Sequence, residues 1–184
     1  MKKGIYKCIL RCSLLLSLLC ASFCMVQAQD DIFDLARKNQ HAALAEHLKR
    51  VSVDTVSASG YSLLHLAVYN NCTETVKLLL AEGAAVELQD PSGNTALMGA
   101  CYKGYCDMVA LLLVYGADPD QLNYNKASAL FFAVTFGHRD IVTKLLQHHV
   151  NLDQRDQSGK TALDYAIGQD HEAIISMLRD AQPE

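Results

Sequence analysis

The chain has 184 residues, of which 51% are hydrophobic and 20% are charged, and its formal net charge at pH 7 is −4. This acidic balance argues against nucleic acid and anionic membrane surfaces as partners, because binding to phosphates rests on a surplus of basic side chains.

The first 28 residues predict a signal peptide. Basic residues at positions 2, 3, 7 and 11 precede an apolar run of 14 residues at 13–26, and Val26-Gln27-Ala28 supplies the small residues of a cleavage site. A retained membrane anchor is the alternative, but the run is too short to span a bilayer comfortably. We therefore expect cleavage after Ala28, no membrane insertion afterwards, and a mature protein in the periplasm or secreted.

Cleavage would change both the charge and the cysteine content. Four of the 16 basic residues and none of the 20 acidic ones lie in 1–28, so residues 29–184 keep 12 basic and 20 acidic side chains and a net charge of −8. Only Cys72, Cys101 and Cys106 remain of the seven cysteines. This odd, sparse set does not predict a disulfide framework. A Cys101–Cys106 disulfide and two free thiols both stay open as alternatives.

Residues 31–56 predict two short helices and a loop. Ile32, Phe33 and Ala36 mark the first helix, 42–48 form the second with His41 at the turn, and 51–59 have no helical pattern.

A 33-residue period follows, with copies at 57–89, 90–122 and 123–155 and a shorter copy at 156–184. Five columns keep this step, namely Gly60, Gly93, Lys126 and Gly159; Ser62, Thr95, Ser128 and Thr161; Leu64, Leu97, Leu130 and Leu163; Ala67, Ala100, Ala133 and Ala166; and Val76, Val109, Val142 and Ile175. Such a period is typical of a solenoid in which each repeat contacts only its neighbours.

The copy at 90–122 predicts a loop, a helix, a turn and a second helix. Thr95 can cap the first helix and Gly104 can end it. Asp107 can open the second helix, where a carboxylate meets the positive end of the helix dipole, and Gly116 can end that one.

These motifs resemble the ankyrin repeat, which has the same period. They are G-x-T-x-L-x-x-A, Gly137-His138 between the helices, V-x-L-L-L at 76–80, and a closing Gly116-Ala117-Asp118. The resemblance covers nearly the whole chain after residue 30. It implies an all-α solenoid of stacked helix-turn-helix units with loop or β-hairpin fingers on one side, and it implies no reaction. We also expect no cofactor.

Within this resemblance, 29–184 is one repeat domain. Residues 31–56 form a degenerate N-terminal capping repeat, 57–89, 90–122 and 123–155 form full repeats, and 156–184 form the C-terminal cap. Lys126 and His149 occupy glycine positions, where a side chain at positive φ costs on the order of 1 kcal/mol.

No set of residues predicts catalysis or a metal site, so we expect a protein that is not an enzyme. His41, His138 and His171 share the turn column, and His65 holds the T-x-L-H position; in the family these are structural. His148 and His149 could hold a metal or haem, but adjacent helical side chains point about 100° apart.

The columns that the fold leaves free predict the binding surface. In similar proteins the fingers and the exposed ends of the first helices line a concave surface that binds partners. Its occupants here are Tyr61, Tyr69, Asn70, Asn94, Tyr102, Lys103, Tyr124 and Phe136. Tyrosine is common at interface hot spots, although these tyrosines could instead pack between neighbouring repeats.

These observations favour a monomeric, non-enzymatic protein-binding module of the periplasm or secreted space. Asp90, Asp120, Asp153 and Asp156 along the fingers suggest a protein partner with an apolar patch and a basic rim. The alternative is an accessory or inhibitor protein, of the immunity type, for a secreted or oxidative-stress or haem enzyme.

Overall fold

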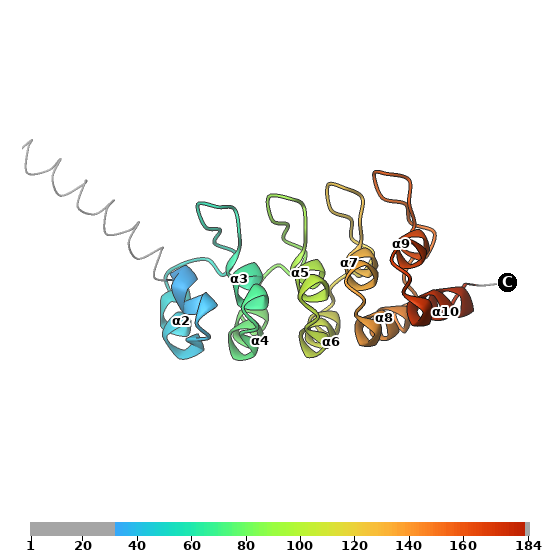
Figure 1. Cartoon of the computed structure of the whole chain (residues 1–184). Helices are drawn as coiled ribbons and strands as arrows, with labels where there is room; N and C mark the ends of the chain where they lie inside the picture. Colours follow the sequence, from blue (N-terminus) through green and yellow to red (C-terminus); the bar gives the residue numbers. More distant parts are fainter. Residues whose placement is uncertain (1–31, 183–184) are drawn as a thin grey trace, which may run out of the picture.

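A computed structural model describes residues 32–182, and the predicted signal peptide lies outside them. The described residues form an all-α solenoid, which confirms the predicted fold class (Figure 1). After a helical segment at 32–37, the helices are α2 (His41–Leu48), α3 (Leu63–Tyr69), α4 (Thr73–Ala81), α5 (Ala96–Lys103), α6 (Cys106–Val114), α7 (Ala129–Thr135), α8 (Arg139–Leu146), α9 (Ala162–Gly168) and α10 (Glu172–Asp180). No helix among them is long and apolar enough to cross a membrane.

The helices stack in two layers. The first helices α3, α5, α7 and α9 contact one another in sequence, and each contacts the second helix of its own pair. Four loops, which we call the fingers (residues 51–62, 84–95, 117–128 and 150–161), project from the first-helix side (Figure 1). We call the surface formed by the fingers and the first helices the concave face.

Local sequence signals set the ends of the helices. The Thr95 hydroxyl accepts a hydrogen bond from the Met98 amide at 3.4 Å, and Gly104 ends α5 with a φ of 76°. The second helix of this pair begins one residue earlier than predicted, at Cys106, which places Asp107 in its first turn.

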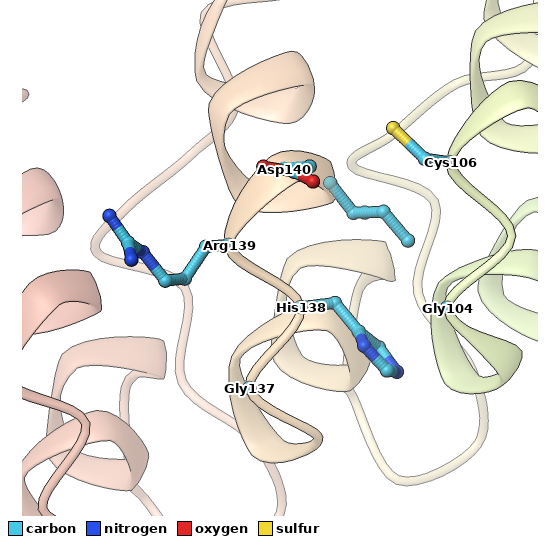
Figure 2. Close-up of a pocket in the computed structure, with 7 residues that line it drawn as sticks. Gly104, Cys106, Gly137, His138, Arg139 and Asp140 are labelled. Atoms are coloured by element: carbon cyan, nitrogen blue, oxygen red, sulfur yellow. The ribbon is translucent and has the colours of Figure 1, made fainter.

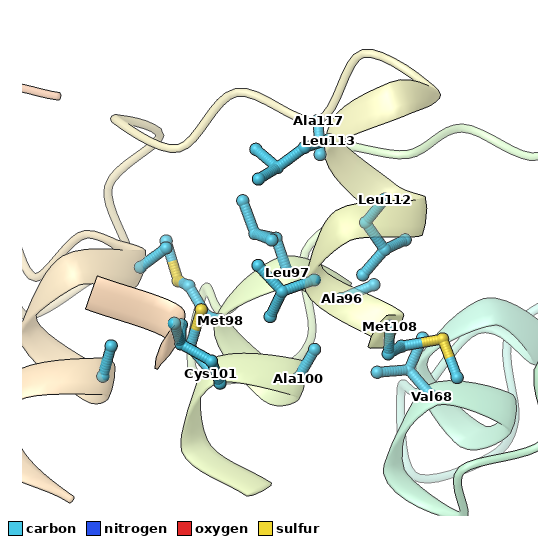
Figure 3. Packing of buried hydrophobic residues seen from close by; sticks show 14 of the residues in the cluster. Val68, Ala96, Leu97, Met98, Ala100, Cys101, Met108, Leu112, Leu113 and Ala117 are labelled. Carbon is cyan, nitrogen blue, oxygen red and sulfur yellow. The ribbon is translucent and has the colours of Figure 1, made fainter. Parts of the chain in front are cut away.

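The periodic apolar columns form one continuous core. All four alanines of the column at 67, 100, 133 and 166 have no exposed surface, which lets the helices of one pair and of neighbouring pairs approach closely. In the central repeat, Leu97 and Met98 on α5 and Leu112 on α6 belong to this core of buried side chains (Figure 3). Neighbouring repeats therefore supply the burial that one helix pair lacks.

Each finger contains the same tight turn, and the side chain of the first residue of that turn holds it in shape. These residues are Ser57, Asp90, Asn123 and Asp156, one period apart, and the side chain of each accepts one or two backbone N–H bonds from the turn. Only an isolated bridge between Val56 and Ser62 interrupts the loops, so within 32–182 the fingers are loops rather than β-hairpins.

A second series of carboxylates connects successive fingers. Asp54 accepts from the Ala85 amide at 2.8 Å, Glu87 from the Asp118 amide at 2.8 Å, and Asp120 from the Asn151 amide at 2.9 Å. The prediction that acidic finger residues simply face a partner therefore needs correction: Asp90 is only 3% exposed, and Asp90, Asp120 and Asp156 all accept backbone hydrogen bonds within the fold.

Two further predictions concern individual residues. Lys126 and His149 have φ values of 59° and 54°, so side chains do occupy the left-handed conformation where the family has glycine. Cys72, Cys101 and Cys106 are free thiols, so the structure contains no Cys101–Cys106 disulfide. Cys101 is fully buried, as expected of a small apolar side chain in the core column.

Candidate functional site

Five of the eight predicted binding residues line one open hollow on the concave face. This outer hollow, about 450 Å³ in volume, lies between the first helices α3 and α5. Tyr61, Tyr69, Asn70, Tyr102 and Lys103 line it together with Leu66. The alternation of aromatic and polar groups gives this hollow both an apolar wall and hydrogen-bonding groups at its rim.

A smaller hollow of about 200 Å³ lies next to it, above Gly99 in the middle of α5. Tyr69, Tyr102 and Phe132 line it from three successive first helices, with Met98 and the predicted residue Asn94 completing it. We call it the Gly99 pocket. It shares Tyr69 and Tyr102 with the outer hollow, so the two form one continuous depression.

Gly99 is the residue that sequence reasoning missed. A helical glycine costs about 1 kcal/mol relative to alanine, so its presence in mid-helix needs a reason. An added Cβ would lie 3.0 Å from Cε1 and 3.1 Å from Cζ of Tyr69, so the missing side chain makes room for the tyrosine ring. The signal was present in the sequence, because the same column holds Leu66, Phe132 and Tyr165 in the other repeats.

Phe136 belongs to the far edge of this surface. Its ring meets the Tyr102 ring edge to face, with centroids 4.7 Å apart and planes at 84°. It also lines a third hollow of about 350 Å³ with Phe131, Phe132 and Tyr165. The aromatic surface therefore extends without a break from α3 to α9.

Tyr124 lies apart from the hollows. Its ring and backbone cover Gly93 of the preceding finger, and its amide donates to the Ser92 carbonyl at 3.3 Å. Although 67% exposed, Tyr124 helps to stack one finger on the next.

The tyrosines differ in how far they pack between neighbouring repeats. Tyr69 packs between repeats, over Gly99, and its hydroxyl donates to Asp90 at 3.4 Å. Burial and the Asp90 charge raise the pKa of Tyr69 far above its ordinary value, so the hydroxyl stays protonated. Tyr102 is instead 44% exposed, with the Lys103 amine 5.6 Å from its ring centre.

Asn94 is held in place by its neighbours. Its amide nitrogen donates to Asp90 Oδ2 at 3.2 Å, and its amide oxygen accepts from the Asn123 side chain at 2.8 Å. This chain of bonds ties the rim of the Gly99 pocket to two fingers, which makes that rim rigid before any partner arrives.

The histidines in the family positions have structural partners. His65 is buried, with its ring nitrogens 2.8 Å from the Ser62 hydroxyl and 3.0 Å from the Asn94 carbonyl oxygen. The rings of His138 and His171 lie against Gly104 and Gly137 of the preceding turns. His148 and His149 are exposed side chains after α8, and no group of three or more potential metal ligands occurs within 32–182.

A crevice on the opposite end of the helices holds a cysteine and a histidine. It has a volume of about 460 Å³ and is lined by Cys106, His138, Arg139 and Asp140 among others. Figure 2 shows the His138 ring directed at Gly104 while Arg139 points to the other side. No hydrogen bond joins the Cys106 thiol to His138 in the described part of the chain, so this crevice does not form a nucleophile–base pair.

The comparison with protein families agrees with the architecture. A family model of ankyrin repeats (3 copies) matches residues 32–123 and again residues 98–184. A search of curated proteins gave no significant match.

Proposed function

The chain belongs to the ankyrin-repeat family, whose members are generally protein-interaction modules, and we propose that it binds a protein partner through the concave face, outside the cytoplasm, without catalysing a reaction.

The outer hollow carries this proposal. It brings Tyr61, Tyr69 and Tyr102 together with Asn70 and Lys103, from two repeats, on the side from which the fingers project. None of the periodic core columns needs an aromatic residue at these positions, since the corresponding place of Tyr102 is Thr135 in the next repeat and Gly168 in the last. Rigid amphipathic rings around a depression are the residue type and shape typical of interface hot spots.

The location rests on the sequence of residues 1–28. A basic start, a 14-residue apolar run and a Val-Gln-Ala site support export and cleavage. Cell fractionation with N-terminal sequencing tests this part by itself, with Gln29 expected as the first residue of the mature protein. A protein that keeps residues 1–28 would refute it.

Capture of a partner from the extracytoplasmic fraction tests the binding surface. The double variant Tyr69→Ala with Tyr102→Ala should reduce capture at least tenfold, because hot-spot tyrosines each contribute about 1–2 kcal/mol or more. Tyr115→Ala is the matched control, since Tyr115 is 43% exposed, against 44% for Tyr102, but ends α6 in the outer layer. Equal capture by the double variant and the control would refute the concave face as the binding surface.

A role beside a haem enzyme has no specific support. It would use His148 and His149 as ligands, and these exposed side chains lie beyond α8, away from the residues that line the aromatic hollows. We therefore propose an inhibitor or accessory role only in a general sense. Binding can cover a surface of the partner, and it stabilises the partner's folded state by mass action.

A further inference from the structure

We propose that the Gly99 pocket receives an arginine side chain from a basic segment of the partner, an inference that rests on the protein-binding function proposed above.

Among the four repeats that share this column, only one has no side chain there. Leu66, Phe132 and Tyr165 occupy the corresponding positions, whereas at Gly99 the Tyr69 ring and a hollow of about 200 Å³ take the place of a side chain. Gly99 is helical and has no positive φ, so the chain conformation does not require glycine there. The missing side chain opens the pocket and lets Tyr69 lean over α5 as one wall.

The walls are suited to a planar cation. Tyr69, Tyr102 and Phe132 surround the pocket from three helices, and aromatic faces attract cations through their negative π surface. Guanidinium favours such sites over ammonium because it is planar and less strongly hydrated. The amine of Lys103 lies over the Tyr102 ring, 5.6 Å from its centre, so this ring already makes a cation–π contact.

The charge around the pocket also favours a basic partner. The three fingers nearest to it (51–62, 84–95 and 117–128) carry five acidic residues, Asp54, Glu87, Asp90, Asp118 and Asp120, against one basic residue, Lys126. Asp90 lies directly behind the wall, where its carboxylate accepts from the Tyr69 hydroxyl and from Asn94. This surplus of acidic over basic side chains on the fingers favours a cationic group at the pocket.

The inference is tested with acetyl-arginine amide, acetyl-citrulline amide and acetyl-leucine amide as probes, titrated into the folded protein and followed by NMR shifts of the Gly99 amide and the tyrosine rings. Citrulline has nearly the shape of arginine without its charge. We expect arginine to bind in the millimolar range and citrulline roughly fivefold or more weakly, the effect of about 1 kcal/mol of cation–π attraction.

Three variants locate the site. Gly99→Leu introduces the leucine that the repeat at 57–89 has at this position, Leu66, and should abolish binding. Phe132→Leu, which removes one wall without filling the pocket, should weaken it severalfold. Lys103→Gln should strengthen arginine binding about twofold or more, because it removes a neighbouring cation. Circular dichroism and urea unfolding establish that each variant is folded.

The opposite results would overturn the inference. Leucine binding as tightly as arginine would identify a purely apolar pocket. Weaker arginine binding by Lys103→Gln would contradict the charge argument. The absence of a shift with every probe at about 50 mM would show that the pocket binds none of these side chains. Any of these, combined with loss of partner capture in the Tyr69→Ala and Tyr102→Ala variant, would leave the proposed protein-binding function standing and remove only the arginine.

Discussion

The contact between successive fingers can be measured with a matched pair of glycine substitutions. Gly93 and Gly159 occupy the same finger position two repeats apart, with φ values of 79° and 78°. A Cβ on Gly93 would lie 2.6 Å from Tyr124 Cδ1 and 2.7 Å from the Tyr124 backbone nitrogen, whereas a Cβ on Gly159 has no atom within 4 Å. The two positions therefore share the backbone strain and differ in the space around it.

The expected losses of stability follow from these contacts. Alanine at positive φ costs about 1 kcal/mol at either position. At Gly93 the clash with a backbone atom requires the next finger to move, which adds about 1–3 kcal/mol. We therefore expect Gly159→Ala to lower the free energy of unfolding by about 1 kcal/mol and Gly93→Ala by about 2–4 kcal/mol.

Urea unfolding at 25 °C, followed by circular dichroism, gives both values from the midpoint and the slope. Similar midpoints for the two variants, with unchanged slopes, would show that Tyr124 does not press on the preceding finger. A larger loss of stability for Gly159→Ala than for Gly93→Ala would contradict the contact between Tyr124 and Gly93.

Three further predictions concern backbone strain, protonation and thiol reactivity. Lys126→Gly should raise the free energy of unfolding by roughly 0.5–1 kcal/mol in the same urea assay, because it relieves a φ of 59°; a loss would mean that the Lys126 side chain stabilises the finger. Burial lowers the pKa of His65 below its ordinary 6.5, so the unfolded chain binds more protons below that pH and stability should fall as the pH drops from 7.5 to 5.5. The fall should be smaller in His65→Gln, and an equal pH dependence in the two proteins would refute this assignment. Cys106, which is partly exposed, should react with a thiol reagent in the native protein. Cys101 and Cys72 should react only after unfolding, because burial raises the pKa of both thiols. Mass mapping of the labelled peptides tests this, and labelling of Cys101 in the native protein would contradict the packed core.

The fold could be predicted because its signals are local and repeated. The Ala100 column, the cap at Thr95 and the glycine at 104 each act within one helix pair, and the 33-residue period states which pairs are equivalent. The role of the polar residues in the fingers was harder to predict. Asp90 and Asp156 were expected to face a partner, although the series Ser57, Asp90, Asn123, Asp156 is a turn-capping pattern. In this pattern the side chain accepts from a backbone amide two or four residues further along the chain.

The positions of the predicted binding residues in the repeat could be predicted from the sequence, and the shape of the surface that they form could not. Tyr61, Tyr69, Asn70, Tyr102 and Lys103 could be chosen from the columns that the repeat leaves free, and the structure places them around one hollow. Tyr124, chosen by the same rule, lies over Gly93 instead. The rule identifies a face of the solenoid, but it does not distinguish a side chain that faces solvent from one that covers the next finger.

The repeat length, the buried columns and the resemblance to a known family could be read from the amino-acid sequence, because each of these depends on the spacing of residues along the chain. The packing of neighbouring repeats places Tyr69 over Gly99, arranges three rings from three helices around the pocket, and puts Asp90 behind it. These features depend on the distance and angle between neighbouring repeats, which no single repeat encodes.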